Sequence, residues 1–310
     1  MKRVFHAIAF VTTILVLSQT SAHAQAARTF VASNGNDNQA CSRAQPCRTF
    51  AGAIAKTAAG GVINCVDAAD YAAVTIAKSI AIVCDNTTAG ISSNAVAVTV
   101  SIATTDTVTL SGLDLEGNGV GTAGVSLANG GTLELRKVRI SGFRGGGSNR
   151  AFGVNFAPTA AAKLHVSDST ITDNGFGFGG AGIGFVTSGP TISAEITNSN
   201  IDNNLLGMRV FGAANICSVT VTNSSLSGNG AGINTGGSNV MLQNVTIANN
   251  SQVGISNTNP GGTVRVGNST VSGNGIGVNT VFGAFTTSYK NNQIRGNTTD
   301  GTPLAAETAE

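Results

Sequence analysis

The chain contains no tryptophan and little charge of either sign, and both shortages restrict what it can bind. Aromatic residues make up 5% of the 310 residues, and sugar rings usually stack on flat aromatic faces, so tight carbohydrate binding is disfavoured. Charged residues make up 10%, with a formal net charge of +2. Such a chain lacks the broad electrostatic surface that binds nucleic acid or anionic lipid, and we expect no nucleic-acid partner.

Long apolar runs are also missing, apart from one near the N-terminus. Residues 1–24 read as a secretory signal peptide, in which Lys2 and Arg3 precede an apolar stretch, Ile8–Leu17, and a small-residue cleavage site ends at Ala24. No later stretch has the roughly 20 apolar residues that a membrane span requires, so we expect no membrane insertion. These features predict a secreted or periplasmic protein whose mature chain begins after cleavage near Ala24.

Cysteine is scarce, with five residues. In an oxidising compartment Cys41 is expected to pair with Cys47, and Cys65 with Cys84, although the spacing alone leaves the connectivity open. Two such disulfides would staple the N-terminal region. Cys217 is left over and is interpreted as a small buried apolar residue, with a reactive or intermolecular thiol as the alternative.

The strongest feature that the chain does contain is an internal repeat of the form Asn-Ser-x-(Ile/Leu/Val)-x-x-Asn. Self-similarity at a period of this length indicates a solenoid, because one repeat cannot bury its apolar side without its neighbours. Successive repeats begin 21 to 31 residues apart. Their central apolar residues are Leu115, Ile140, Ile171, Ile201, Leu226, Ile247, Val271 and Ile294.

Each repeat also has alternating apolar and polar residues before its centre and a Gly-(Ile/Val/Met) step after it, as in LELRKV and GVSL. Alternation is typical of half-buried strands, so a repeat holds about three short strands separated by Asn and Gly corners. Coils stacked about 4.8 Å apart then bury a continuous core. Because the coils are longer and less regular than hexapeptide repeats, we predict an all-β, right-handed parallel β-helix over residues 91–300, followed by a loose tail over residues 301–310.

Two rows of asparagine follow from this register. Asparagine stands three residues after the centre in seven of the eight copies, and Phe143 interrupts the row. A second row, three residues before the centre, runs from Asp168 to Asn291. Stacked amides can bond in a ladder, and asparagine tolerates left-handed backbone at corners. We interpret both rows as structural rather than as ligand sites.

Residues 25–90 lack the repeat and are predicted to form an N-terminal cap and the first coils. A short capping helix is expected from about Thr49, with Phe50 and Ile54 on one face and Gly60-Gly61 as its stop. A solenoid exposes its core at each end, and an amphipathic helix can cover it.

The N-terminal strings TFVASNGND, PCRTFAGAI, GGVINC and AIVCD, followed by asparagine-rich coils, resemble bacterial members of the pectin-lyase-like superfamily. The resemblance covers nearly all of the mature chain and implies a right-handed parallel β-helix. The superfamily includes pectate and pectin lyases, polygalacturonases, alginate epimerases and proteins of unknown role, so the fold does not select one activity. The polygalacturonase-like motifs Asn-Thr-Asp, Asp-Asp, Gly-His-Gly and Arg-Ile-Lys do not occur, and we find no acidic cluster as strong as a pectate-lyase-like calcium site requires.

One row of polar residues is a candidate catalytic site. Glu134, His165 and Glu195 each lie six residues before a repeat centre, on the outward side of the same predicted sheet, and His165 is the only histidine after the signal peptide. The two carboxylates would lie about 10 Å apart, slightly beyond the ~6.5–9.5 Å of inverting glycoside hydrolysis.

Our hypothesis makes Glu134 or Glu195 a general acid or base and His165 a proton-transfer or substrate-binding group. Arg136 and Lys163 would contact an acidic sugar. The alternative is that a Glu-His-Glu row is a favourable cross-strand charge arrangement on a solvated face.

Two weaker candidates have structural alternatives. An oxygen-rich turn could hold calcium, although an Asx-type turn explains the same residues, and no other cofactor is expected. The turn contains Asn34, Asn36, Asp37 and Asn38. A basic group could touch acidic polysaccharide or form a solvated face. It consists of Arg136, Lys137, Arg139, Arg144 and Arg150.

These observations favour an exported, non-catalytic β-helix protein with a binding or structural role at the cell exterior, associated with polysaccharide. One alternative is a polysaccharide lyase, glycoside hydrolase or epimerase of the pectin-lyase-like type. Another is an adhesin or surface-layer component. The sequence leaves the ligand and the oligomeric state open.

Overall fold

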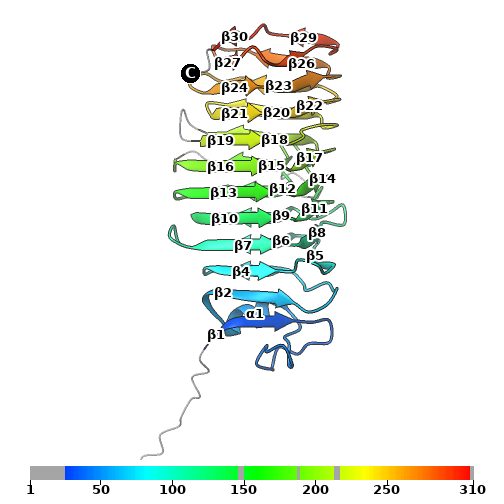
Figure 1. Cartoon of the computed structure of the whole chain (residues 1–310), viewed down its shortest axis with the longest axis vertical. Helices are drawn as coiled ribbons and strands as arrows, with labels where there is room; N and C mark the ends of the chain where they lie inside the picture. Colours follow the sequence, from blue (N-terminus) through cyan, green and yellow to red (C-terminus); the bar gives the residue numbers. More distant parts are fainter. Residues whose placement is uncertain (1–24, 146–149, 187–188, 213–216, 308–310) are drawn as a thin grey trace, which may run out of the picture.

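The computed structural model is a single column of stacked coils, and it describes residues 25–145, 150–186, 189–212 and 217–307 (Figure 1). The predicted signal peptide, residues 1–24, lies outside this part of the chain. Three β-sheets run the length of the column, and the strands within each sheet are paired in parallel. The predicted right-handed parallel β-helix is confirmed.

Sheet A has 12 strands, one from each successive coil. In chain order they are β1 (Ala26–Val31), β2 (Thr57–Cys65), β4 (Ile80–Val83), β7 (Thr107–Ser111), β10 (Gly131–Arg136), β13 (Ala162–Ser167), β16 (Ile192–Thr197), β19 (Cys217–Thr222), β21 (Asn239–Gln243), β24 (Thr263–Gly267), β27 (Phe285–Ser288) and β30 (Ala305–Ala306).

Sheet B contains the short strands at the repeat centres, in a group of five and a group of three that the bridges Asn200–Ser225 and Ser225–Thr246 connect. The group of five is β5 (Ala89–Ser92), β8 (Leu113–Glu116), β11 (Arg139–Ser141), β14 (Thr170–Thr172) and β17 (Asn200–Asp202). The group of three is β22 (Thr246–Ala248), β25 (Thr270–Ser272) and β28 (Gln293–Ile294).

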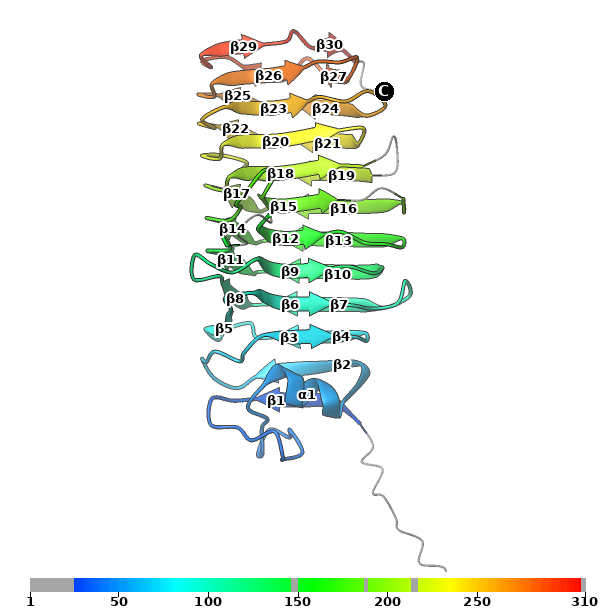
Figure 2. The same cartoon turned by 180° about the vertical axis from the view of Figure 1, so that it is seen from behind.

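Sheet C has ten strands and stands beside sheet A when the column is seen from either side (Figure 2). Its strands are β3 (Val74–Ile76), β6 (Val96–Val100), β9 (Ala123–Leu127), β12 (Phe152–Phe156), β15 (Ala181–Val186), β18 (Leu206–Phe211), β20 (Ala231–Gly236), β23 (Val253–Asn257), β26 (Ile276–Thr280) and β29 (Thr299–Gly301).

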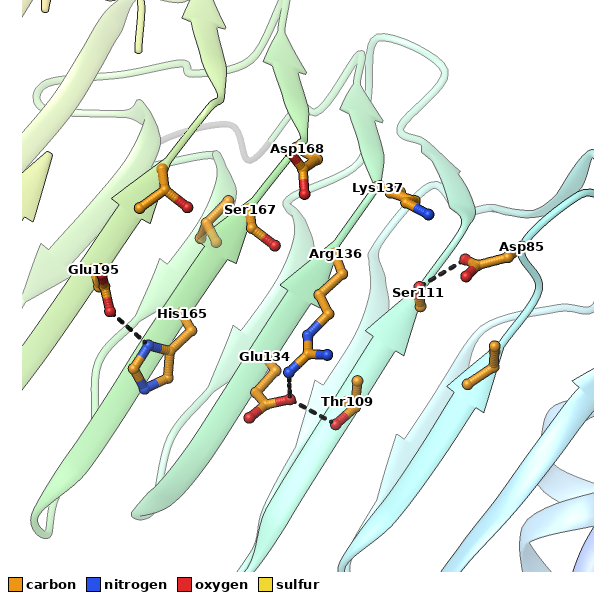
Figure 3. A pocket seen from close by; sticks show the side chains of 13 residues that line it. Asp85, Thr109, Ser111, Glu134, Arg136, Lys137, His165, Ser167, Asp168 and Glu195 are labelled. Atoms are coloured by element: carbon orange, nitrogen blue, oxygen red, sulfur yellow. Dashed lines mark hydrogen bonds and ion pairs between the residues drawn. The ribbon is translucent and has the colours of Figure 1, made fainter. Parts of the chain in front are cut away.

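The predicted register is observed between neighbouring coils. Ile140 pairs with Leu115 on one side and with Ile171 on the other, and all three side chains are fully buried. On sheet A the residues six positions earlier are also neighbours, since His165 pairs with Glu134 and with Glu195 on adjacent strands (Figure 3). Alternation thus sends one set of side chains into the core and the other to the surface.

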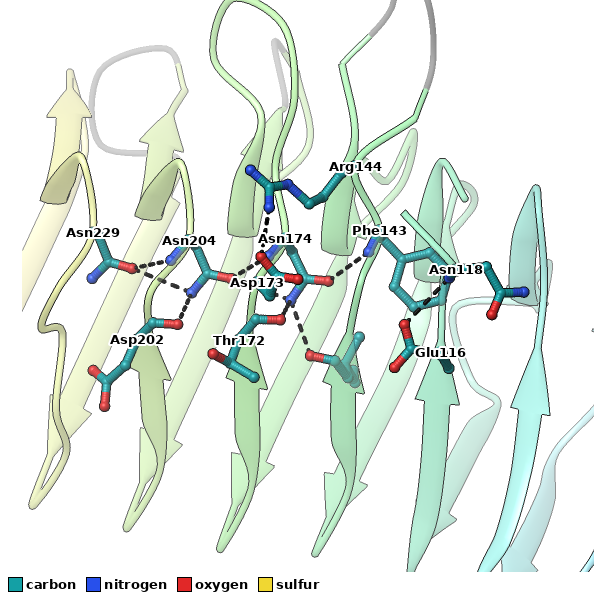
Figure 4. Close-up of polar contacts among 11 residues, drawn as sticks. Glu116, Asn118, Phe143, Arg144, Thr172, Asp173, Asn174, Asp202, Asn204 and Asn229 are labelled. Carbon is teal, nitrogen blue, oxygen red and sulfur yellow. Dashed lines mark hydrogen bonds and ion pairs between the residues drawn. The ribbon is translucent and has the colours of Figure 1, made fainter. Parts of the chain in front are cut away.

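The first asparagine row forms a buried ladder beside sheet B (Figure 4). Asn204 is typical: its backbone N–H donates to Asn229 Oδ1 at 2.8 Å, and its Nδ2 donates to the carbonyls of Ile171 at 2.9 Å and Asp202 at 3.0 Å. Its own Oδ1 accepts the backbone N–H of Asn174 at 3.0 Å. Each side chain thereby satisfies corner backbone groups that water cannot reach.

The ladder differs from the prediction in two ways: it contains fewer residues, and its asparagines do not have the left-handed backbone expected of them. It begins with the Phe143 backbone N–H, which donates to Asn174 Oδ1, whereas Asn118 is exposed and bonds Asn94 instead. Left-handed backbone falls on the residue before each ladder asparagine, as at Asn203 (φ 58°) and Asn249 (φ 56°), rather than on the ladder itself. The second row does take left-handed φ values, for example 49° at Asn198.

A column of glycines lies against the ladder, where the sequence shows the Gly-(Ile/Val/Met) step. A Cβ at Gly207 in β18 would lie 2.5 Å from the carbonyl oxygen of Gly232 and 2.9 Å from Asn229 Nδ2. Gly232 meets Gly254 O and Asn250 Nδ2 in the same way. These positions need glycine because the backbone of the next coil and the ladder amide both occupy the space of a side chain.

The N-terminal cap contains the expected helix, α1 (Phe50–Lys56), with Thr49 as N-cap residue accepting the Gly52 N–H at 3.0 Å. Phe50 is fully buried and packs on Tyr71 at a ring-centroid distance of 5.0 Å. The predicted stop at Gly60-Gly61 is wrong. The helix ends at Lys56. Thr57 is its C-cap residue, donates its hydroxyl to Ala53 O and opens β2, so both glycines lie within a strand.

Both predicted disulfides, Cys41–Cys47 and Cys65–Cys84, are present in the N-terminal region.

The predicted loose tail is wrong for residues 301–307, because β30 pairs with β27 and Leu304 packs against the core. Glu307 also forms an ion pair with Arg265 at 3.0 Å. Backbone pairing to the preceding coil, rather than apolar content, orders this segment. Residues 308–310 lie outside the described part.

Replacing Asn204 by alanine is expected to destabilise the β-helix by about 3 kcal/mol, because the Asn174 N–H and the Ile171 carbonyl lose their partner without gaining water. Urea unfolding followed by circular dichroism would measure the change. Ser193→Ala, an exposed position on β16, is the matched control and should shift the midpoint little. Equal midpoints for the two variants would contradict the structural role of the ladder.

Gly207→Ala is expected to cost about 2 kcal/mol, since the added methyl group forces the next coil outward or displaces the Asn229 amide. The same unfolding measurement applies. Gly189→Ala is a suitable control because nothing lies within 4 Å of a Cβ there. A neutral Gly207→Ala would show that the coils can separate at low cost.

Candidate functional site

A groove runs across the outward face of sheet A, over the row that the sequence singled out (Figure 3). It has a volume of about 630 Å³ and crosses β4, β7, β10, β13 and β16. Four rung spacings of about 4.8 Å give it a length of roughly 19 Å. Its lining residues are Val83, Asp85, Thr109, Ser111, Glu134, Arg136, Lys137, His165, Val166, Ser167, Asp168, Glu195 and Thr197.

Glu134 is held by its neighbours rather than free in the groove. Its Oε2 lies 2.8 Å from an Arg136 Nη atom and accepts the Thr109 hydroxyl at 3.1 Å. The Glu134 side chain is 23% exposed, whereas that of Arg136 is 57% exposed. The Glu134 carboxylate is therefore already occupied by two protein partners on its own and the preceding strand.

His165 faces Glu195 and not Glu134. Its Nδ1 lies 3.5 Å from Glu195 Oε2, and both side chains are about half exposed, at 45% and 57%. At this distance and exposure the pair is a weak, solvated contact. The structure brings the three candidate residues onto adjacent strands. They form two separate contacts, Glu134 with Arg136 and His165 with Glu195.

The two predicted anion-contact residues lie at different places. Arg136 lines the groove and is engaged with Glu134, whereas Lys163 faces a second hollow near the start of the strands, with Thr132 and Ser193. The larger basic group is divided as well, because Arg139 pairs with Asp114 at 2.9 Å and Arg144 with Asp173 at 2.8 Å. The expected positive patch is therefore mostly neutralised by neighbouring acids.

Sequence reasoning missed several groove residues. Thr109 lies in the same register, six residues before Leu115, and extending the row by one coil would have found it. Asp85 accepts the Ser111 hydroxyl at 2.7 Å, but its coil lacks the Asn-Ser motif that set the register. Asp168 was read only as part of the second asparagine row.

Comparisons with known proteins agree with this architecture. A family model described as "Right handed beta helix region" matches residues 152–308, half of the chain. The chain belongs to the right-handed β-helix family. A search of curated protein sequences found no match.

Two solved structures are similar to this right-handed β-helix protein. The crystal structure of pectate lyase Pel9A matches with a TM-score of 0.55 at 16% identity, over 91% of this chain and 77% of that one. The A-module of the Azotobacter vinelandii mannuronan C-5 epimerase AlgE4 matches with a TM-score of 0.41 at 15% identity, over 81% of this chain and 91% of the other. At these identities the likeness concerns the fold.

The oxygen-rich turn uses its carboxylate for local structure. Asp37 accepts the backbone N–H groups of Arg48 at 2.7 Å and Thr49 at 3.0 Å, together with the Thr49 hydroxyl at 2.7 Å. Burial raises the pKa of Asp37, but these hydrogen bonds outweigh it and leave the pKa lowered. Asn36 Oδ1 accepts the Asn38 N–H at 2.9 Å, which is an Asx turn.

Within the described ranges, no group of three or more His, Cys, Asp or Glu side chains is arranged to hold a metal ion. In the same ranges, no helix of the β-helix protein has the length and apolar character of a membrane span.

Cys217 is fully buried at the start of β19 and forms no disulfide. Burial raises the pKa of its thiol to about 12, although a hydrogen bond with Ser238 opposes the shift. The thiolate is the reactive form, so this cysteine fits the interpretation as a buried apolar residue.

Cys217 in the native protein is therefore expected to react with iodoacetamide at least about a hundredfold more slowly than an unfolded cysteine at the same mildly alkaline pH. Mass spectrometry of timed samples would measure the rate, with the protein in concentrated guanidinium chloride as the control. Comparable rates in the two conditions would mean that the thiol is accessible in the folded β-helix.

Proposed function

We propose that this chain is an exported, non-catalytic β-helix protein that binds polysaccharide along the groove on sheet A. The observation that carries the proposal is the continuous row of outward polar side chains, one from each coil, at the floor of the groove: Thr109, Glu134, His165, Glu195 and, beyond the groove, Thr220. Regularly spaced donors and acceptors about 4.8 Å apart suit an extended chain of repeating polar units. The fold-level similarity to a pectate lyase supports the choice of ligand class.

Export is supported by two features. The N-terminal segment has the sequence pattern of a signal peptide, and both disulfides lie in the cap, where they would persist in an oxidising compartment. A role at the cell exterior follows from this location.

The environment of the carboxylates argues against catalysis. Glu134 is engaged by Arg136 and by the Thr109 hydroxyl, and Glu195 lies two rungs away on a half-exposed face, so the two carboxylates do not act on one point of the groove. A general acid or base must lie within hydrogen-bond reach of the substrate atom that it acts on. The Glu134 carboxylate is instead occupied by protein partners.

The charges of the groove favour a neutral polysaccharide over an acidic one. Asp85, Asp168 and the two glutamates line it, against Arg136 and Lys137. A polyanion would meet more negative than positive side chains, and such like-charge contacts are costly. Neutral hydroxyl-rich chains avoid this penalty and can use the carboxylates as acceptors.

The second candidate is a polysaccharide lyase, hydrolase or epimerase. The His165–Glu195 contact favours it, because a histidine beside a carboxylate is a common proton-transfer pair.

An adhesin or surface-layer role would predict that deletion of the gene weakens attachment of cells to a surface.

Affinity electrophoresis in gels containing neutral or acidic polysaccharides tests the proposal. We expect retardation by at least one neutral polysaccharide, and an affinity about tenfold lower for Glu134→Gln or Glu195→Gln, because each loses an ionised acceptor. Asp114→Asn, an ion-paired carboxylate on sheet B outside the groove, is the matched control. Binding that is unchanged in both groove variants would remove the groove as the site.

The same polysaccharides, incubated with the protein, distinguish the catalytic candidate. Absorbance of unsaturated products and the release of reducing ends would both stay at the level of the blank if the protein only binds. Turnover that His165→Ala abolishes would overturn the non-catalytic proposal.

A further inference from the structure

Two arginines meet on the outward side of sheet C, away from the groove. Arg209 lies in β18, and Arg150 lies two residues before the start of β12. The loop between β14 and β15 passes over both, and a Cβ at Gly179 in this loop would lie 2.8 Å from Arg209 Nε and 3.4 Å from Arg150 Nε. Both guanidinium groups therefore approach the backbone at Gly179, where a side chain would clash with Arg209.

These side chains use few of their hydrogen-bond donors. Arg150 donates from Nε to the Phe178 carbonyl at 2.6 Å. Arg209 stacks on the Phe211 ring, with Cζ 4.5 Å from the centroid, and one of its Nη atoms is buried without a partner. Each guanidinium has five N–H donors. Donors that bind neither protein nor water are costly to bury.

No negative charge compensates the pair within the described part of the chain. Neither arginine takes part in any of the ion pairs that hold the other exposed arginines, such as Arg139 and Arg144. Burial, and then the charge of Arg150, lowers the pKa of Arg209. Asn234, the neighbour of Arg209 on β20, is neutral, and its Oδ1 is buried without a partner too.

We propose that Arg150 and Arg209 form a binding site for an oxyanion, which the structure places on sheet C beneath the loop between β14 and β15. A phosphate, a sulfate or a carboxylate would supply both the missing negative charge and acceptors for the free guanidinium donors. The planar guanidinium fork matches such groups in a bidentate geometry. The site is independent of the polysaccharide groove, which lies on sheet A.

The anion has two possible sources, a free ion or an acidic group on a saccharide. Phe178 is 94% exposed next to the carbonyl that Arg150 binds, and Phe176 in the same loop is 43% exposed. An exposed aromatic face beside a cationic site suits a sugar acid better than a free ion, so the two sources are compared directly in the experiment.

Isothermal titration of the mature protein with inorganic phosphate, sulfate and galacturonate tests the site. We expect at least one of them to bind with an affinity that falls about tenfold or more in Arg150→Gln. Arg209→Lys keeps the positive charge but loses the planar guanidinium group, so it should also weaken binding. Arg295→Gln is the matched control, because Arg295 is exposed and already paired with Asp300. A preference for galacturonate that Phe178→Ala removes would identify a saccharide as the source, and a preference for phosphate or sulfate would identify a free ion.

Absence of binding by the wild-type protein to all three anions would overturn the proposal. So would an affinity that both Arg150→Gln and Arg209→Lys leave unchanged. Circular dichroism of the variants establishes that they are folded, and Arg150, at the exposed end of the pair, is the position that disturbs the coils least. Groove variants such as Glu195→Gln should leave anion binding intact, which separates this site from the polysaccharide groove.

Discussion

The structure depends on the close stacking of parallel coils, in which the asparagine ladder and the glycine column occupy the same narrow space. In the coils from Phe143 to Asn274, the chain turns a buried corner beside sheet B. The Asn204 side chain, for example, bonds backbone groups of its own coil and of the preceding one, and its Nδ2 also donates to Asn229 Oδ1 of the next coil. It can do so only because Gly207 and its equivalents have no side chain. Because these contacts repeat along the column, a single register fixes the position of every outward residue.

This register explains why function must be sought on the outer faces. Inward positions are filled by stacked apolar side chains, and the corners are filled by amides, so neither has room for a ligand. The outer faces then differ in charge. The groove on sheet A carries more acids than bases, and its glutamates have partners. The arginine pair on sheet C takes part in none of the ion pairs among the described residues. A protein with little net charge can thus present two local surfaces of opposite sign.

The sequence predicted the fold and the row Glu134, His165 and Glu195 because both follow from periodicity, which is a local property. It did not predict which neighbour each side chain would contact. His165 turns to Glu195, and Arg136, which was expected to contact an acidic sugar, binds Glu134. The arginine pair was also invisible, since Arg150 and Arg209 are separated by two coils and by a loop whose course the sequence does not specify. The end of α1 and the ordered residues 301–307 were decided by pairing with neighbouring strands, which outweighs local propensity.

By itself the sequence determined the solenoid, its rung register and the division into inward, outward and corner positions, whereas the connectivity of the four N-terminal cysteines was fixed only by the structure. These are set by the order of residues along the chain, because a repeat must bury its apolar side against its own copies. Only the tertiary structure decided which charged groups contact each polar residue, what shape the groove has, and that Arg150 lies beside Arg209. These features depend on how side chains from different coils are oriented. The repeat pattern fixes which residues are neighbours, but it does not fix the conformations of their side chains.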